Sequence, residues 1–209
     1  MKIFIQTLEN FPRELYEKYF NMADIQRQNS VNRMKIPDDR KRSILGEMLA
    51  RKAIYEICGI NQEEIEFYRT EKGKPCCKNA NVFFSISHSK NYVVCVADKN
   101  EIGVDIEFIR PVEPRITRIS CTESDKEYIF GTSNPDLEAL KFTDESLLRF
   151  FKVWTAKEAY FKYLGTGIEG LRTVSYKEIS PLCTTVSKNG FVLSIYSKEK
   201  SEINFENIL

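Results

Sequence analysis

Two long helical segments, each followed by strand-like segments, constrain most strongly how this chain of 209 residues can fold. The first helix is predicted at about Asp38 to Cys58, with Asp38 or Asp39 as its N-cap and Gly59 as its end. The second is predicted at about Asp144 to Leu164, ending at Gly165. Because the pattern of a long helix and later strands occurs twice, it indicates a pseudo-twofold organisation in two halves.

Shorter segments in which apolar and polar residues alternate are predicted as strands. These are residues 2–8, 65–69, 82–87, 92–97, 173–177 and 191–196. Polar helices are predicted at 12–21 and 114–130. Residues 88–91 are predicted to connect two strands, and Asn189-Gly190 is typical of a hairpin turn. Since no Gly/Ser-rich linker separates the halves, we expect them to be tightly packed.

Charge and composition exclude several functional classes. The net charge is +1, which does not support a generally basic surface for nucleic acid. No apolar run approaches the roughly 18 residues of a membrane span, and the first residues lack the pattern of a secretory signal. The six cysteines have no zinc-ligand spacing, so we expect reduced thiols in a cytoplasmic protein.

Acidic residues recur in two motifs. In Gly-Val-Asp-Ile-Glu, which ends at Glu107, strand alternation places Asp105 and Glu107 on one face. In Trp-Thr-Ala-Lys-Glu-Ala-Tyr-Phe-Lys, which ends at Lys162, helical periodicity places Glu158 within an apolar stripe. A carboxylate there needs a compensating charge. Three carboxylates suit a hard divalent cation and a lysine suits a phosphate, so the combination predicts phosphate chemistry with magnesium.

Each motif also has a simpler interpretation. Asp105 and Glu107 could be the solvent-facing positions of an edge strand. Glu158 and Lys162 match an ordinary i,i+4 helix pair, which contributes only a few tenths of a kcal/mol. The occurrence of both motifs in one chain favours the functional interpretation.

Polar residues near two turns are further candidates for phosphate binding. Arg69, Lys72 and Lys74 surround a glycine turn, and the alternative is an exposed hairpin tip. His88 and Ser87 could donate to a phosphate, although a lone histidine at a strand end is more often a turn residue. The chain has neither a Walker loop nor a Gly-x-Gly-x-x-Gly motif, so those devices do not hold the phosphate.

Together these motifs resemble the 4′-phosphopantetheinyl transferase superfamily, in its larger single-chain, pseudo-dimeric (surfactin-synthetase-activating) form. The matching segments are 43–46, 69–75, 84–89, 103–107 and 154–162. The resemblance implies an α+β fold of two similar pseudo-twofold-related halves. Each half would be a long helix on a small antiparallel sheet, with the active site in the cleft between them. Residues 1–100 would bind the nucleotide end of coenzyme A, and residues 101–209 would carry the magnesium site and catalytic helix.

The activity that the resemblance implies is magnesium-dependent transfer of 4′-phosphopantetheine from coenzyme A to a serine of an apo acyl or peptidyl carrier protein. The product that leaves is 3′,5′-ADP. A monomer that binds neither nucleic acid nor membrane is expected. The alternatives are a non-catalytic module that binds coenzyme A or a carrier protein, and a magnesium-dependent pyrophosphate hydrolase.

The resemblance also assigns roles to individual residues. The metal ligands would be Asp105, Glu107 and Glu158. The catalytic residues would be Glu158, Lys162 and Glu123, with Glu158 favoured as the base and Glu123 as its alternative. The residues that bind the cofactor would be Arg27, Ser43, Arg69, Lys74, Ser87, His88, Asp105 and Lys162. Where the family carries a basic residue before the first long helix, this chain has Ser30, and Arg27 or Arg33 would replace it.

Overall fold

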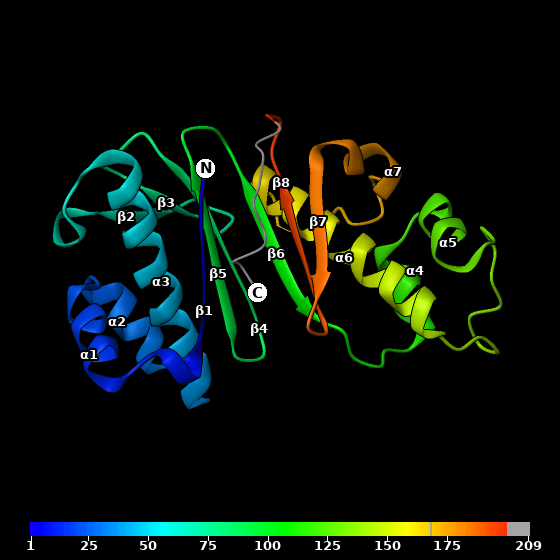
Figure 1. Ribbon diagram of the computed structural model, residues 1–209, viewed down its shortest axis with the longest axis horizontal. Helices are drawn as coiled ribbons and strands as arrows, with labels where there is room; N and C mark the ends of the chain where they lie inside the picture. The colour runs from blue at the N-terminus through cyan, green and yellow to red at the C-terminus, as the bar shows by residue number, and fades with distance from the viewer. Residues whose placement is uncertain (168, 200–209) are drawn as a thin grey trace. The chain divides into compact units, whose positions relative to one another are not determined.

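The computed structural model describes residues 1–167 and 169–199, which divide into two compact units. Of these described residues, unit 1 comprises Met1–Thr70 and Pro75–Glu101, and unit 2 comprises Glu71–Lys74 and residues 102–199. Each unit combines a long helix with a small antiparallel sheet (Figure 1). The predicted α+β fold of two similar halves is confirmed, whereas the roles assigned to the halves and the binding cleft stay predictions.

Unit 1 contains a three-stranded sheet of order β1-β5-β4 and a separate two-stranded sheet, β2-β3. The strands are β1 (Lys2–Thr7), β2 (Phe67–Arg69), β3 (Pro75–Cys77), β4 (Phe83–Ser89) and β5 (Tyr92–Asp98). The helices are α1 (Arg13–Met22), α2 (Ile25–Asn32) and α3 (Pro37–Cys58), with 3-10 turns η1 (Leu8–Asn10) and η2 (Gln62–Glu64). Fully buried side chains of α3, among them Ile44 and Leu45, join Val93 and Cys95 of β5 in one core.

Two glycines define α3. Gly59 ends the helix in the left-handed conformation, as predicted. A Cβ added to Gly46 would lie 3.0 Å from the side chain of Ile86, so this glycine allows α3 to lie close to β4. The predicted aspartate cap is wrong, because the helix begins at Pro37 and Asp38 and Asp39 lie in its first turn. Their charges there still favour the helix dipole.

Unit 2 contains a sheet of order β6-β8-β7. The strands are β6 (Gly103–Phe108), β7 (Cys183–Lys188) and β8 (Phe191–Tyr196). The helices are α4 (Thr117–Ser120), α5 (Glu123–Phe130), α6 (Asp144–Leu164) and α7 (Tyr176–Ile179), with 3-10 turns η3 (Pro114–Ile116) and η4 (Ser180–Leu182). The long helix α6 packs against β6 and β8, and Gly165 ends it as predicted.

Several predicted elements were wrong. The helix predicted at 114–130 is interrupted at Cys121, because Thr122 starts a new helix with a capping box. The strand predicted at 173–177 is instead the N-cap and start of α7. The predicted connection at 88–91 is shorter, because β4 continues to Ser89 and Lys90 turns the chain with φ 51. Helix α2 and strands β3 and β7 were not predicted.

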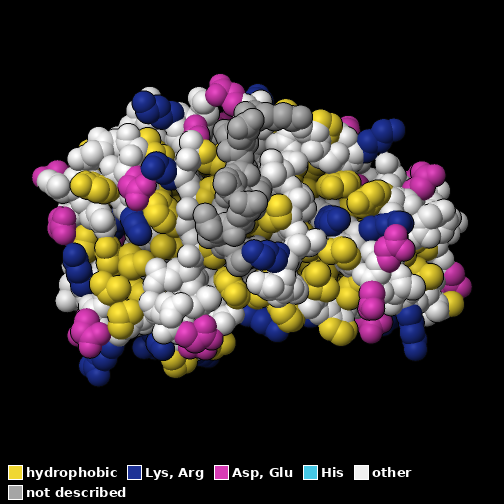
Figure 2. Space-filling view, viewed as in Figure 1, with side chains coloured by type: hydrophobic (Ala, Val, Ile, Leu, Met, Phe, Trp, Pro, Cys, Tyr) yellow, Lys and Arg dark blue, Asp and Glu magenta, His cyan; other side chains and the backbone are white. Residues whose placement is uncertain are grey.

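Basic and acidic side chains are interspersed on the face shown in Figure 2, in keeping with the net charge of +1. None of the helices in the described residues combines the length and the apolar character needed to cross a membrane. In the same part of the chain the six cysteines form no disulfide.

Candidate functional site

The acidic site of unit 2 depends on a close approach between β6 and α6. A Cβ added to Gly103 would lie 1.9 Å from the carbonyl oxygen of Ala159 and 2.5 Å from the amide nitrogen of Tyr163. Any side chain at position 103 would therefore push the strand and the helix apart. Because the backbones are this close, side chains two residues further along β6 reach the side chains of α6.

Lys162 and Asp105 form the contact that joins these two elements. The Nζ atom of Lys162 donates to Oδ1 of Asp105 at 2.7 Å. The Asp105 side chain is 6% exposed and that of Lys162 is 31% exposed. The predicted strand is present and lies at the edge of its sheet, but Asp105 is buried rather than solvent-facing.

Glu158 lies in the electrostatic field of the two β6 carboxylates. The pKa of Glu158 is raised to about 7, chiefly by burial and then by the charge of Asp105, with a smaller effect of Glu107, whereas Lys162 opposes the rise. The side chain of Glu107 is 24% exposed, and its Oε2 accepts a bond of 3.2 Å from Arg110. These three acidic side chains therefore share one charge environment, and Glu158 and Lys162 are more than a surface helix pair.

The carboxylates of this site are candidate ligands for a magnesium ion. Among residues 1–167 and 169–199, no three His, Cys, Asp or Glu side chains already stand at metal-ligand positions. The donor set nevertheless fits the ion chemically, because it offers only carboxylate oxygens, the ligands that magnesium prefers. Burial is the main reason that the pKa of Glu158 is raised, and repulsion from Asp105 and Glu107 adds to it; a divalent cation would relieve this repulsion.

A buried ion pair, which the sequence did not predict, adjoins this site. Lys157 of α6 donates to the Ser120 carbonyl at 2.8 Å and to the Asp125 carboxylate. Asp125 also accepts the N–H groups of Thr122 at 2.8 Å and of Tyr176 at 2.7 Å. One carboxylate thus ties α6 to the first turns of α5 and α7. The sequence gave no signal that Lys157, five residues before Lys162 on the same helix, is buried.

Two other predicted residues of unit 2 lie elsewhere. Glu123 is exposed at the first position of α5. Lys74 donates to the carbonyl oxygen of Tyr163 at 2.7 Å, near the end of α6, and its stem contacts Gly165. A lysine at this place complements the negative end of the helix dipole. Their assigned roles stay predictions.

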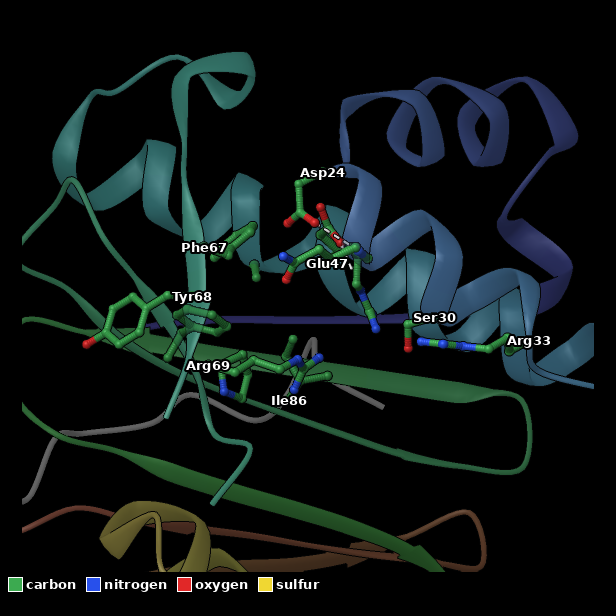
Figure 3. Close-up of a pocket in the computed structure, with 13 residues that line it drawn as sticks. Asp24, Ser30, Arg33, Glu47, Phe67, Tyr68, Arg69 and Ile86 are labelled. Atoms are coloured by element: carbon green, nitrogen blue, oxygen red, sulfur yellow. Dashed lines mark hydrogen bonds and ion pairs between the residues drawn. The ribbon is translucent and has the colours of Figure 1, made fainter. Parts of the chain in front are cut away.

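Unit 1 holds a pocket of about 530 Å³ between α2, α3 and the β2-β3 hairpin (Figure 3). Its polar lining comes from Asp24, Gln26, Arg27, Ser30, Arg33, Glu47 and Arg69. Its apolar lining comes from Ala50, Phe67, Tyr68, Pro75, Phe84 and Ile86. Three guanidinium groups and an aromatic wall suit a ligand that has both an anionic group and a flat ring.

Arg27 is held in this pocket by α3. Its Nη2 donates to the Ser43 hydroxyl at 2.7 Å, which brings together two of the predicted cofactor residues. Its Nε donates to Oε2 of Glu47 at 3.3 Å. The other oxygen of Glu47 accepts from Arg51 at 2.9 Å, and both of these side chains are buried. Glu47 was not predicted, although the Arg51 four residues later is a helical pairing signal.

Arg27 lies close enough to Arg69 to affect the pKa of the Arg69 guanidinium. Burial lowers the pKa of Arg69, and the positive charge of Arg27 lowers it further, whereas Glu47 and Asp24 oppose this. Two neighbouring guanidinium groups attract an anion. Ser30 and Arg33 line the same pocket, so both predicted substitutes for the missing basic residue, Arg27 and Arg33, are present at it.

Ser87 and His88 point to opposite faces of the sheet, because successive residues of a paired strand alternate. His88 is exposed and shares its face with Phe84 and Ile86, which line the pocket. Ser87 is buried on the other face. A joint role for the two side chains in holding one phosphate stays a prediction.

Comparison with known sequences identifies the family of this chain. Residues 12–100 match the family described as 4′-phosphopantetheinyl transferase, N-terminal, and residues 101–204 match the 4′-phosphopantetheinyl transferase superfamily. The 4′-phosphopantetheinyl transferase gsp of Aneurinibacillus migulanus is 30% identical over 200 residues, which cover 96% of this chain and 76% of that protein. The chain belongs to the 4′-phosphopantetheinyl transferase superfamily. It is therefore a transferase, as the motifs predicted.

A second relative agrees with this assignment. The 4′-phosphopantetheinyl transferase Sfp of Bacillus subtilis (strain 168) is 30% identical over 157 residues, which cover 75% of this chain and 66% of that protein. Membership in the superfamily implies coenzyme A as a substrate and a carrier protein as a partner of this phosphopantetheinyl transferase.

Proposed function

We propose that the chain transfers 4′-phosphopantetheine from coenzyme A to a serine of an apo acyl or peptidyl carrier protein, in a reaction that depends on Mg²⁺. The observation that carries the proposal is the contact between Lys162 and Asp105 beside Glu158. This strand–helix pair carries carboxylate oxygens, which would suit a cation, and an ammonium group, which would suit a phosphate. Family membership supplies the chemistry for which such a pair is suited.

The metal site proposed consists of Asp105, Glu107 and Glu158. When bound there, Mg²⁺ would neutralise charge on the diphosphate of coenzyme A and on the departing 3′,5′-ADP. Lys162 would bind the same diphosphate, since its ammonium lies on α6 one turn after Glu158.

The pocket of unit 1 is proposed to receive the nucleotide end of coenzyme A. Arg27, Arg33 and Arg69 would bind the phosphate on the ribose, since guanidinium groups form paired bonds to phosphate oxygens. The rings of Phe67 and Tyr68 line the same pocket and would pack against the adenine.

The transfer itself requires one bond to form and one to break. The serine oxygen of the carrier attacks the phosphorus that bears pantetheine, and the bond from that phosphorus to 3′,5′-ADP breaks. The serine proton passes to a carboxylate, for which Glu158, directly or through water, is the proposed base and Glu123 the alternative. Positioning and charge neutralisation supply most of the rate, since such transfers need little covalent chemistry from the protein.

Intact-mass measurement of an apo carrier protein, incubated with the purified chain, coenzyme A and Mg²⁺, tests the proposal. We expect the carrier to gain the mass of one phosphopantetheine group, and several apo carriers from fatty-acid, polyketide and peptide synthesis should be compared. No mass gain on any of them with folded protein would contradict the transferase. Glu158→Gln should abolish transfer, whereas Glu123→Gln should leave it nearly unchanged if Glu158 is the base.

Two other functions are separated by the same experiment. A module that only binds would retain coenzyme A without any turnover. A hydrolase would release phosphopantetheine in the absence of a carrier, which chromatography of the small molecules would detect. A monomer in the cytoplasm is part of the proposal and is checked by light scattering and by cell fractionation.

A further inference from the structure

We propose that Lys162 is an internal counter-ion that occupies Asp105 in the metal-free protein and leaves it when the divalent cation binds. The lysine would then compete with the metal before coenzyme A arrives and bind the diphosphate afterwards. This inference rests on the proposed function, because it concerns the same carboxylates.

The contact has the geometry of a direct competition. Nζ of Lys162 lies 2.7 Å from Oδ1 of Asp105. A cation that takes this oxygen as a ligand would sit close to the ammonium, and two positive charges at such separation repel strongly where the surroundings are partly desolvated. The carboxylate oxygen therefore serves one of the two partners at a time.

The two partners differ in their freedom to move. Asp105 is nearly buried, and its strand is fixed by pairing with Ser194 of β8 and by the close packing of Gly103 on α6. The Lys162 side chain is 31% exposed at the end of four rotatable bonds. When the contact breaks, the lysine is the partner that moves, while the carboxylate keeps its position.

The contact also has a reason to exist without metal. Asp105, Glu107 and Glu158 bring negative charges together on facing elements, and this raises the free energy of the folded chain when no cation is present. The Lys162 ammonium offsets part of that repulsion. Because linkage is reciprocal, an ion pair that stabilises the metal-free fold and is lost when the metal binds weakens metal binding by the same factor.

Calorimetric titration of Mg²⁺ into metal-free protein, without coenzyme A, tests the inference. Lys162→Met removes the competitor, and Lys152→Met, ten residues earlier on α6, removes an equal charge as a matched control. We expect Lys162→Met to bind Mg²⁺ about fivefold more tightly than Lys152→Met, the size of a partly exposed ion pair. Equal or weaker binding by Lys162→Met would overturn the inference.

Two further measurements keep the result decisive. Lys162→Gln repeats the titration with a polar side chain, so that a folding defect of the methionine variant does not decide the outcome. Carrier modification by the wild-type chain is measured separately. If the wild type transfers phosphopantetheine but neither variant binds Mg²⁺ more tightly than the control, the counter-ion role is wrong and the proposed function stands.

Discussion

Replacing Lys157 with methionine is expected to lower the free energy of unfolding of unit 2 by about 3–5 kcal/mol, because it leaves a buried carboxylate without its counter-charge. The side chains of Lys157 and Asp125 are 1% and 0% exposed. Methionine nearly matches the length of the lysine stem, so the cavity contribution is small. Asp125 would keep the N–H donors of Thr122 and Tyr176, which favours the lower end of this range.

Urea unfolding followed by tryptophan fluorescence measures this change within unit 2, since Trp154 of α6 is the only tryptophan. Asp125→Asn should also destabilise, because it leaves the Lys157 ammonium with the Ser120 carbonyl as its remaining partner in this network. The double variant should be at least about 1.5 kcal/mol more stable than the sum of the single effects predicts. A loss below about 1 kcal/mol for Lys157→Met would refute the view that this pair stabilises the unit.

Three further changes test other parts of the structure. Gly103→Ala should cost about 3 kcal/mol in urea unfolding, because the new Cβ meets the Ala159 carbonyl, and an unchanged midpoint would contradict the close packing. In EDTA, the folded pKa of about 7 for Glu158 against 4.5 in the unfolded chain means that the wild type loses stability as pH rises from 4.5 to 7. Glu158→Gln cannot titrate there and lacks this loss. Its free energy of unfolding should equal that of the wild type below pH 4.5 and exceed it by about 2 kcal/mol above pH 7, after a discount for solvent exposure. A difference between the two proteins that does not change with pH would contradict the raised pKa of Glu158. Arg69→Met should raise the KM for coenzyme A about tenfold with little change in kcat, and an unchanged KM would exclude the pocket as the nucleotide site.

The sequence predicted the elements that have a strong period and a glycine end. Both long helices satisfy these conditions, and α3 and α6 end at Gly59 and Gly165 as expected. It failed where tertiary contacts override local pattern. Strand β7 is rich in threonine and serine and owes its conformation to pairing with β8, which no local period reports. The break before α5 depends on the capping box of Thr122 and Asp125, which the prediction of one continuous helix at 114–130 did not take into account.

Prediction of the site residues also succeeded where a local pattern exists and failed where distant segments meet. The alternation of β6 and the stripe of α6 were sufficient to select Asp105 and Glu158, and the structure brings them together. The burial of Asp105 and its bond to Lys162 were not predictable from periodicity, because they depend on how closely two distant segments approach. Glu47 was missed for a similar reason. It lies on α3 and pairs with Arg51 of the same helix, but its other partner, Arg27, comes from α2.

The two polar sites differ in how they manage charge, and this difference follows from their composition. In the pocket of unit 1, acidic Glu47 and Asp24 moderate a group of arginines, which leaves a positive site that an anion completes. In unit 2, Lys162 and Arg110 offset part of the charge of three carboxylates, which leaves a negative site that suits a cation. Each unit taken by itself therefore has a site whose charge suits one kind of ligand group: an anionic group in the pocket of unit 1 and a cation at the carboxylates of unit 2.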